Sequence, residues 1–204
     1  ALPQANTTSQ NFQFNNADGT PAYEYFWIEI LESVQGSDVW LQMGEWGLGS
    51  FGDFQAWKQA EADKGTGIDE AVNYFLVDGA PAGFGGEGVG NLIDGKTNNK
   101  WCTGFTNRTD EQADPTANGA WIVFKASRAM APTYYSLITG NDTGNSPGRN
   151  WKTWRVYGMN AADQANVVRN SDNWVLIDEK SNVTAGTALN QLPAANFAQA
   201  YFST

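Results

Sequence analysis

The segment YEYFWIEIL, Tyr23–Leu31, carries apolar side chains at both odd and even positions. Aromatic residues such as Tyr25 and Trp27 alternate with a second series that includes Phe26 and Ile28. Successive side chains of an extended strand point to opposite faces, so both faces of this segment would be apolar. Such a pattern is typical of a strand covered on both sides. The segment therefore predicts an internal strand between two packed layers.

Five further stretches of the chain are also predicted to be strands. Turn-rich connectors such as GNDTGNSPGRN and DGAPAGFGGEGVGN lie between them. Short strands with frequent turns predict an all-β protein, either a β-sandwich or a jelly roll. These predicted strands are Val39–Leu48, Trp121–Ala126, Thr133–Gly140, Thr153–Asn160 and Asn173–Lys180.

Two stretches have residues that favour a helix. Phe51–Gly65 contains good helix formers and a closing glycine, and it is interpreted either as a helix or as a polar linker. Ala161–Asn170 is shorter and is predicted to be a loop turn beside the preceding strand.

The charge of the chain argues against two classes of partner. The net charge is −10, from 22 acidic and 12 basic residues, and the basic residues form no cluster. Phosphate backbones and anionic membrane surfaces are bound by clustered Lys and Arg, so nucleic acid is not expected as a partner. No apolar run approaches the roughly 20 residues that cross a bilayer, so membrane insertion is not expected either.

Histidine is absent, and Cys102 is the single cysteine. The chain therefore lacks the usual general base, the usual activator of serine nucleophiles and the usual zinc ligand. Hydrolysis by a pair of carboxylates stays open, but no spacing of Asp and Glu nominates a pair. We therefore expect a protein that is not an enzyme.

An ordered series of motifs begins with NLIDGKTNNKWCT, Asn91–Thr103, and continues with GNDTGNSPGRNWKTWRVYG and NWVLID. The series resembles the discoidin, or coagulation factor 5/8 type C, domain and the related family 32 carbohydrate-binding modules, which have a galactose-binding-like jelly-roll fold. The match covers roughly Glu70 to Thr204, and it departs from the family pattern at Trp151, where the pattern has proline. The matching positions are Asp94, Gly95, Trp101, Asn141, Asp142, Arg149, Trp154, Tyr157, Gly158, Trp174 and Asp178.

The resemblance implies a rotated order of segments. Family members end with a pair of strands that nothing after Thr204 supplies, yet Tyr25–Leu31 and Leu41–Gly49 resemble that pair. The frame Leu-Pro-x-Ala-Asn also occurs twice, starting at Leu2 and at Leu192. We therefore expect residues 1–50 to be closing strands, residues 51–70 to be a connector, and residues 71–204 to be the main body of a sandwich.

Three arrangements could complete such a sandwich. The closing strands could fold onto their own chain, as in a circular permutation. They could complete a neighbouring copy by strand addition, or the chain could be a window of a tandem array. Because a self-contained domain needs the repeated segment only once, completion by another copy is the preferred prediction.

The resemblance also implies a structural calcium ion, because the Asp-Gly loop of these domains often holds one. Oxygen ligands from a tight loop and a final strand suit that ion. The candidates are Asp94, Thr97 and Asn99 in the loop and Glu45 in the closing strands. The alternative is that Asp94 only caps its own turn.

A glycan is the ligand that the resemblance implies. Trp151, in a turn-rich loop, is the main candidate for stacking on a sugar ring, with Phe84 and Phe105 as further candidates. Hydrogen-bonding candidates are Asn107, Arg108, Asn145 and Asn150. In contrast, Arg149 with Asp142 is predicted to pin a loop, and Trp101, Trp154 and Trp174 are predicted to lie in the core.

Two functions follow as hypotheses. The first is a non-catalytic carbohydrate-binding or adhesion module that is secreted and works at the cell surface or outside the cell. The second is a structural subunit of an extracellular filament or repetitive surface protein, assembled from copies by strand complementation.

Overall fold

Antiparallel β-strands provide most of the regular structure. The computed structural model describes the backbone of residues 14–15 and, in full, residues 21–35, 40–49, 72–80, 83–105, 120–169 and 171–204. Its strands are β1 (Phe14–Asn15), β2 (Pro21–Ser33), β3 (Leu41–Met43), β4 (Glu45–Gly49), β5 (Tyr74–Gly79), β6 (Trp101–Thr103), β7 (Ala120–Met130), β8 (Tyr134–Ile138), β9 (Trp151–Met159), β10 (Val175–Lys180) and β11 (Gln199–Ser203). Short 3-10 helices in this part of the chain are η1 (Val89–Leu92), η2 (Pro147–Arg149) and η3 (Gln164–Asn166).

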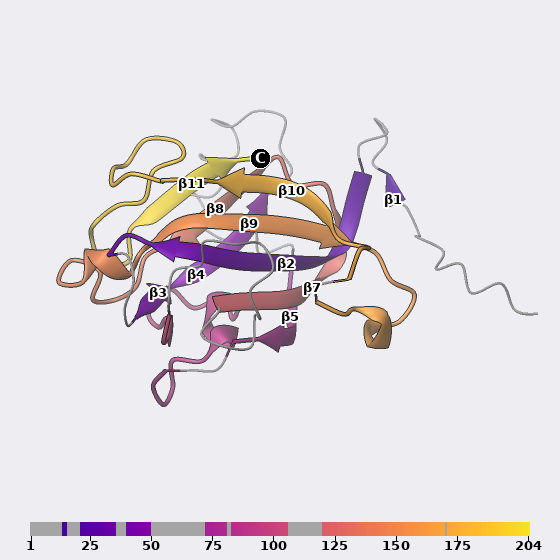
Figure 1. The fold of residues 1–204 in the computed structure, drawn as a ribbon, viewed down its shortest axis with the longest axis horizontal. Coiled ribbons are helices and arrows are strands. Elements are labelled where there is room, and N and C mark those ends of the chain that lie inside the picture. The colour runs from indigo at the N-terminus through magenta and orange to yellow at the C-terminus, as the bar shows by residue number, and fades with distance from the viewer. Residues whose placement is uncertain are drawn as a thin grey trace, which may run out of the picture.

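The strands form two main layers (Figure 1). The larger sheet has the order β10-β9-β2-β7-β5, with β1 attached to β2, and the second layer has the order β11-β8-β4. A separate pair is formed by β3 and β6. The predicted all-β sandwich is confirmed. Among the described residues, no helix has the length and apolar content needed to cross a bilayer.

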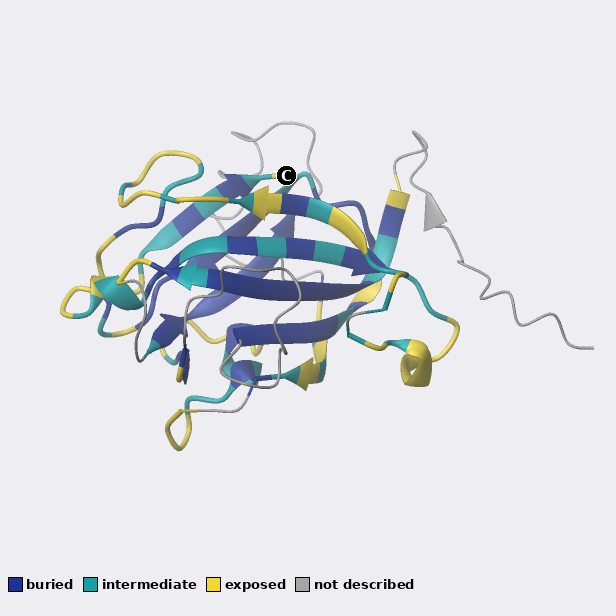
Figure 2. Ribbon diagram, viewed as in Figure 1, coloured by how far each residue is buried: buried dark blue, intermediate teal, exposed yellow. Residues whose placement is uncertain are grey.

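Strand β2 is the middle strand of the larger sheet. Its residue Ile28 is opposite Val156 of β9 on one side and Ile122 of β7 on the other. Phe26, Ile28 and Ile30 are completely buried, and most of β2 is coloured as buried in Figure 2. The apolar residues on both faces of this segment thus form the internal strand that the sequence predicts.

The closing strands complete the same chain. Both edges of β2 are paired with β7 and β9, β4 pairs with β8, and β3 pairs with β6. The arrangement is therefore the intrachain closure, and the preference for completion by another copy is corrected, because the edges that a second chain would use are occupied. The first Leu-Pro-x-Ala-Asn copy and the predicted helix or linker at 51–65 lie outside the described residues.

Aromatic side chains join the two layers. Trp46 of β4 and Phe202 of β11 stack on opposite sides of Tyr135 of β8, with ring centroids 4.5 and 5.2 Å away. The buried Tyr135 hydroxyl donates to Asp178 Oδ2 (2.7 Å) and accepts from Trp154 Nε1 (3.0 Å). Buried polar atoms are stable when they are hydrogen-bonded, so this network ties the second layer to β9 and β10 of the larger sheet.

The predicted strand Val39–Leu48 is divided in two at Gly44. The Gly44 amide donates to the Ile138 carbonyl at 2.7 Å, and a Cβ atom at this position would lie 2.8 Å from the carbonyl oxygens of Ile138 and Thr139. Only glycine permits such an approach without a shift of the backbone. The chain therefore passes from the β3–β6 pair into the second layer at this residue.

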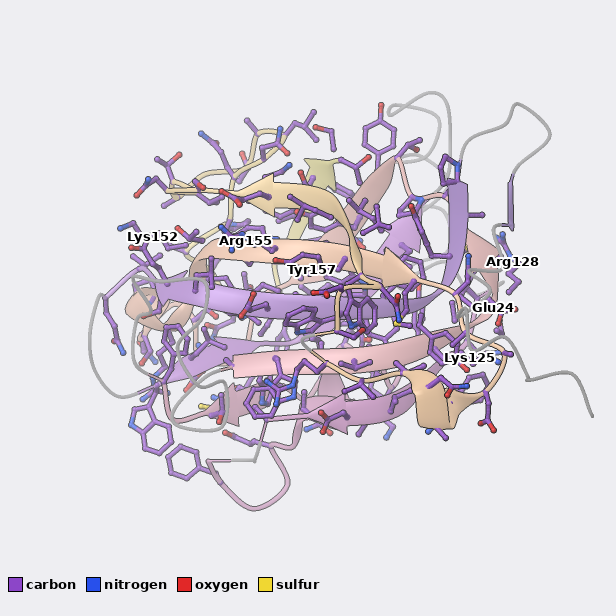
Figure 3. All side chains as sticks on the ribbon, turned by 45° about the vertical axis from the view of Figure 1, so that its right-hand side comes forward. Glu24, Lys125, Arg128, Lys152, Arg155 and Tyr157 are labelled. Atoms are coloured by element: carbon purple, nitrogen blue, oxygen red, sulfur yellow. The ribbon has the colours of Figure 1, made fainter. Side chains whose placement is uncertain are left out.

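The outer face of the larger sheet is also lined with side chains (Figure 3). Trp27 of β2 stacks on Tyr157 of β9, with ring centroids 4.6 Å apart, and Arg155 of β9 pairs with Glu179 of β10 at 2.7 Å. The segment predicted as a loop turn, 161–170, contains η3 and otherwise irregular backbone among its described residues.

Candidate functional site

Several of the described connections gather at one end of the sandwich, which we call the loop end (left in Figure 1). The strand registers show which strand ends meet. Ser33 at the end of β2 is opposite Trp151 at the start of β9, and Glu45 at the start of β4 is opposite Ile138 at the end of β8. The end of β2, the start of β4, the end of β8 and the start of β9 therefore lie together. The loop end comprises the described residues of 34–40, 80–100, 139–150 and 181–198.

The predicted metal ligands meet at the loop end. In the loop, Asn99 Nδ2 donates to Asp94 Oδ2 at 2.8 Å, and Lys96 contacts both Asp94 oxygens, with its amide 3.0 Å from Oδ1 and its Nζ 3.2 Å from Oδ2. Glu45, from β4, is electrostatically coupled to Asp94. Thr97 is exposed in the same loop. Asp94 thus caps its own turn and also lies near a second carboxylate.

Glu45 is a buried acid in an unusual environment. It is 1% exposed, and burial, followed by repulsion from Asp94, raises the pKa of its carboxyl to about 9. The nearby backbone amides of Trp46, Gly95 and Lys96 oppose this rise, but neither carboxylate oxygen accepts a hydrogen bond of normal geometry from a described residue. A buried acid without partners either holds a proton or requires a cation.

The residues fit a calcium ion in part. Besides the Glu45 carboxylate, Asn99 Oδ1 is buried without a hydrogen-bond partner in the described part of the chain, and oxygen atoms of this kind are calcium ligands. The described residues contain no group of three acidic, His or Cys side chains around one point, so Glu45 and Asp94 would supply the charge and neutral oxygens the rest. The ion pair with Lys96 would have to open. We call Glu45, Asp94 and Asn99 the cation cradle.

Two of the predicted aromatic ligand residues are not on the surface. Trp151 is completely buried and packs edge to face against Trp101 and Trp154, with ring centroids 6.2 and 5.8 Å away. Strand β9 begins at Trp151, two residues earlier than predicted, so the indole lies inside the sandwich rather than in a loop. Phe105 is also buried in the core. The prediction that they are exposed stacking residues is wrong.

Of the predicted hydrogen-bonding residues, the structure describes Asn145 and Asn150. Asn145 is exposed at the loop end, whereas Asn150 is 3% exposed and donates from Nδ2 to the Pro193 carbonyl at 3.0 Å. Asn107 and Arg108 lie outside the described residues. Asn150 is therefore not a surface residue, in contrast to Asn145.

Phe84 is exposed as predicted, and the structure adds a partner. Phe84 is 46% exposed and stacks on Trp40, with ring centroids 4.4 Å apart and an angle of 28° between the rings. A Cβ atom at Gly83 would lie 2.4 Å from the indole, so Trp40 packs directly on that glycine. The sequence places Trp40 inside the predicted strand Val39–Leu48 and so does not nominate it as a ligand residue, whereas β3 begins only at Leu41.

Charged residues at the loop end connect the segment that carries Phe84 to the 139–150 loop. The buried Lys100 ammonium lies 2.8 Å from Asp142 Oδ1 and 3.7 Å from Glu87 Oε1, and Arg149 lies 3.2 Å from Asp142 Oδ2. The predicted pinning role of Arg149 with Asp142 is thus consistent with a direct ion pair. The network also reaches the Phe84 segment, because the Glu87 amide donates to the Phe84 carbonyl at 3.2 Å.

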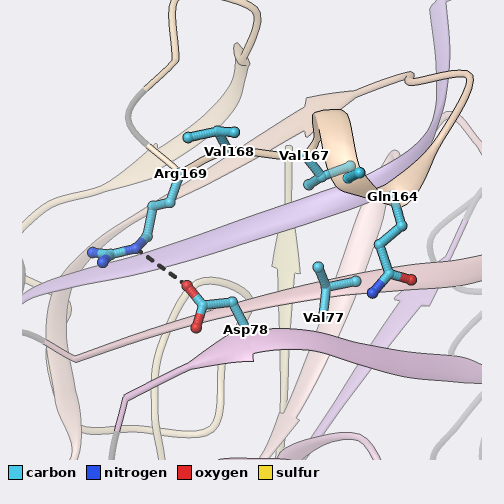
Figure 4. Close-up of a pocket in the computed structure, with 7 residues that line it drawn as sticks. Val77, Asp78, Gln164, Val167, Val168 and Arg169 are labelled. Carbon is cyan, nitrogen blue, oxygen red and sulfur yellow. Dashed lines mark ion pairs between the residues drawn. The ribbon is translucent and has the colours of Figure 1, made fainter.

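An open groove of about 520 Å³ lies on the outer face of the larger sheet, between β5 and the segment that follows η3 (Figure 4). Two of its polar residues, Asp78 and Arg169, pair with each other and with the sheet. Arg169 lies 3.6 Å from Asp78 Oδ2 and stacks on Trp121, and Asp78 also accepts from the Trp121 indole at 3.3 Å. These contacts attach the 164–169 segment to the sheet, so the groove has a structural explanation.

Comparisons of the chain with models of protein families, with curated proteins and with solved structures give no match.

Proposed function

We propose that the protein is a non-catalytic, discoidin-like module that binds carbohydrate outside the cell through the loop end. The observation that carries the proposal is the stacked Trp40–Phe84 pair, in which Phe84 is 46% exposed and lies on a segment held by an ion-pair network. An exposed aromatic face beside polar groups is the arrangement that binds the apolar face of a sugar ring.

A calcium ion in the cation cradle would support this function. Asp94 and Asn99 of the cradle belong to the same segment as Phe84, 83–100. Asn91 fastens that segment by donating from Nδ2 to the carbonyls of Gly86 and Lys100, each at 2.7 Å. A divalent ion would balance the two carboxylates and attach this segment to β4. Its role would be to fix the loop rather than to take part in a reaction.

The proposal is tested by affinity electrophoresis through gels that contain different polysaccharides. We expect at least one polysaccharide to retard the protein and Phe84→Ala to weaken binding by about tenfold, because losing a stacked ring removes on the order of 1.5 kcal/mol. Phe75→Ala is the matched control, since Phe75 is 56% exposed but lies on β5. The proposal is wrong if no polysaccharide retards the protein, or if both variants migrate like the parent.

A further inference from the structure

A buried lysine lies between two carboxylates at the loop end. Lys100, directly before β6, is 4% exposed, and its Nζ lies 2.8 Å from Asp142 Oδ1 and 3.7 Å from Glu87 Oε1. The same Nζ donates to Gln42 Oε1 at 3.1 Å. Charged side chains are seldom buried to this extent, because taking a charge out of water costs free energy. Lys100 is therefore held against its carboxylates and away from solvent.

The contact between Lys100 and Asp142 is close, but it is not a hydrogen bond. Asp142 Oδ1 is buried and has no partner with hydrogen-bond geometry among the described residues, although Lys100 Nζ is only 2.8 Å away. The other carboxylate oxygen, Oδ2, accepts from Arg149 Nη1 at 3.2 Å. The lysine nitrogen thus lies against the carboxyl group in an arrangement that a hydrogen bond does not account for.

The surrounding backbone holds the reacting groups in place. Gly140 lets the loop of Asp142 pack directly on the lysine stem, since a Cβ atom at Gly140 would lie 3.2 Å from Lys100 Cδ. Glu87 is held by the neighbouring strand β6, because its carbonyl accepts from the Cys102 amide at 3.1 Å. Two groups that are kept in contact react far faster than the same groups free in solution.

We propose that Lys100 and Asp142 are joined by an amide bond that the folded chain forms by itself. Lys100 Nζ bonds to Asp142 Cγ, and the bond between Cγ and Oδ1 breaks. Two of the three ammonium protons leave with that oxygen as water. Glu87 is the group placed to carry a proton from the nitrogen to the oxygen, and Arg149 stabilises the negative charge that develops on Oδ2. The step needs no oxidant or other reactant, and it does not depend on a glycan ligand.

This bond fastens the connection between β8 and β9 to the β3–β6 pair. The chain has a single cysteine, Cys102, so a disulfide within the chain cannot do this. A covalent link between distant residues restricts the unfolded chain, as a disulfide does, and so stabilises the folded protein. The loop end is thereby fixed by a bond that neither salt nor a reducing agent breaks.

The test is the mass of the purified and unfolded protein. We expect the chain to be lighter than its sequence by the mass of one water molecule, and trypsin to release residues 97–108 and 129–149 joined through Lys100 and Asp142. Lys100→Met, which keeps a long side chain, should have the full mass of its sequence. Lys125→Met is the matched control and should still lack one water, because Lys125 pairs with Glu24 at 3.5 Å on the more exposed outer face.

The parent protein alone can overturn the inference, since a chain of full mass would show that Lys100 and Asp142 form an ion pair only. A loss of water that persists in Lys100→Met would come from ring closure at an Asp-Gly pair such as Asp94-Gly95, and it would also contradict the bond. Glu87→Gln should slow the reaction and leave a fraction of the purified protein at full mass. Complete joining in this variant would overturn the role of Glu87.

Discussion

Glu45 shows at the scale of one residue why the closing strands matter for function. The residue belongs to β4, yet its electrostatic partner Asp94 lies some fifty positions further along the chain. Their meeting places a buried acid with a raised pKa at the loop end. A single side chain thus links how the chain closes to whether the loop can bind a cation.

The raised pKa of Glu45 predicts that the cation-free protein loses stability as the pH rises. The folded carboxyl keeps its proton up to about pH 9, whereas the unfolded chain ionises near pH 4.5, so the stabilisation is complete below about pH 4.5 and is lost up to about pH 9. We expect unfolding in urea with a chelator to show a loss on the order of 3 kcal/mol from about pH 5 to about pH 7.5. Glu45→Gln should remove this dependence.

The same variant tests the cation. Calcium should raise the melting temperature of the parent protein, and more at pH 8 than at pH 5, because protons and the cation compete for Glu45. Glu45→Gln should respond to calcium little or not at all. Equal calcium responses of parent and variant would exclude Glu45 as a ligand.

Replacing Trp151 is expected to affect the stability of the protein, unlike replacing an exposed sugar-binding residue. Because its indole is completely buried between Trp101 and Trp154, Trp151→Ala should lower the free energy of unfolding by about 3–5 kcal/mol. Phe84→Ala, at a half-exposed ring, should cost no more than about 1 kcal/mol. Urea denaturation of both variants measures the difference, and similar losses would contradict the burial of Trp151.

At the scale of elements, the short strands β3 and β4 carry the chain from one strand pair to another. The change occurs at Gly44, whose backbone approaches the end of β8 closely. The sequence predicts one continuous strand here because its alternation of apolar residues runs through the glycine. Alternation reports which residues are buried, but not which neighbour a strand pairs with.

Gly44→Ala should therefore destabilise the protein. A methyl group 2.8 Å from two carbonyl oxygens requires a backbone shift, with an expected loss of about 1–3 kcal/mol. Gly88→Ala is the matched control, since Gly88 has a φ of −68° and no atom within 4 Å of the added methyl position. Thermal unfolding compares the two variants. Equal melting temperatures would contradict the close approach at Gly44.

At the scale of the whole molecule, the sequence predicts the sandwich and its core well, because apolar patterns persist over whole strands. It also brings Glu45 and Asp94 together, on the strength of a family resemblance. Surface features were harder to predict. Whether an aromatic residue such as Trp151 or Trp40 is exposed depends on the first residue of the neighbouring strand. A local sequence pattern does not define that boundary to within two residues.

Completion within the chain is the feature on which the loop end depends, since Trp40 and Glu45 come from one part of the chain and Phe84 and Asp94 from another. The most direct test is the nuclear Overhauser effect between the methyl groups of Ile28 and those of Val156 and Ile122, its partners on β9 and β7. Methyl-labelled protein is diluted with an excess of unlabelled protein, unfolded and refolded. We expect the signal per labelled chain to stay constant; a signal that falls in proportion to the dilution would show that β2 completes another copy.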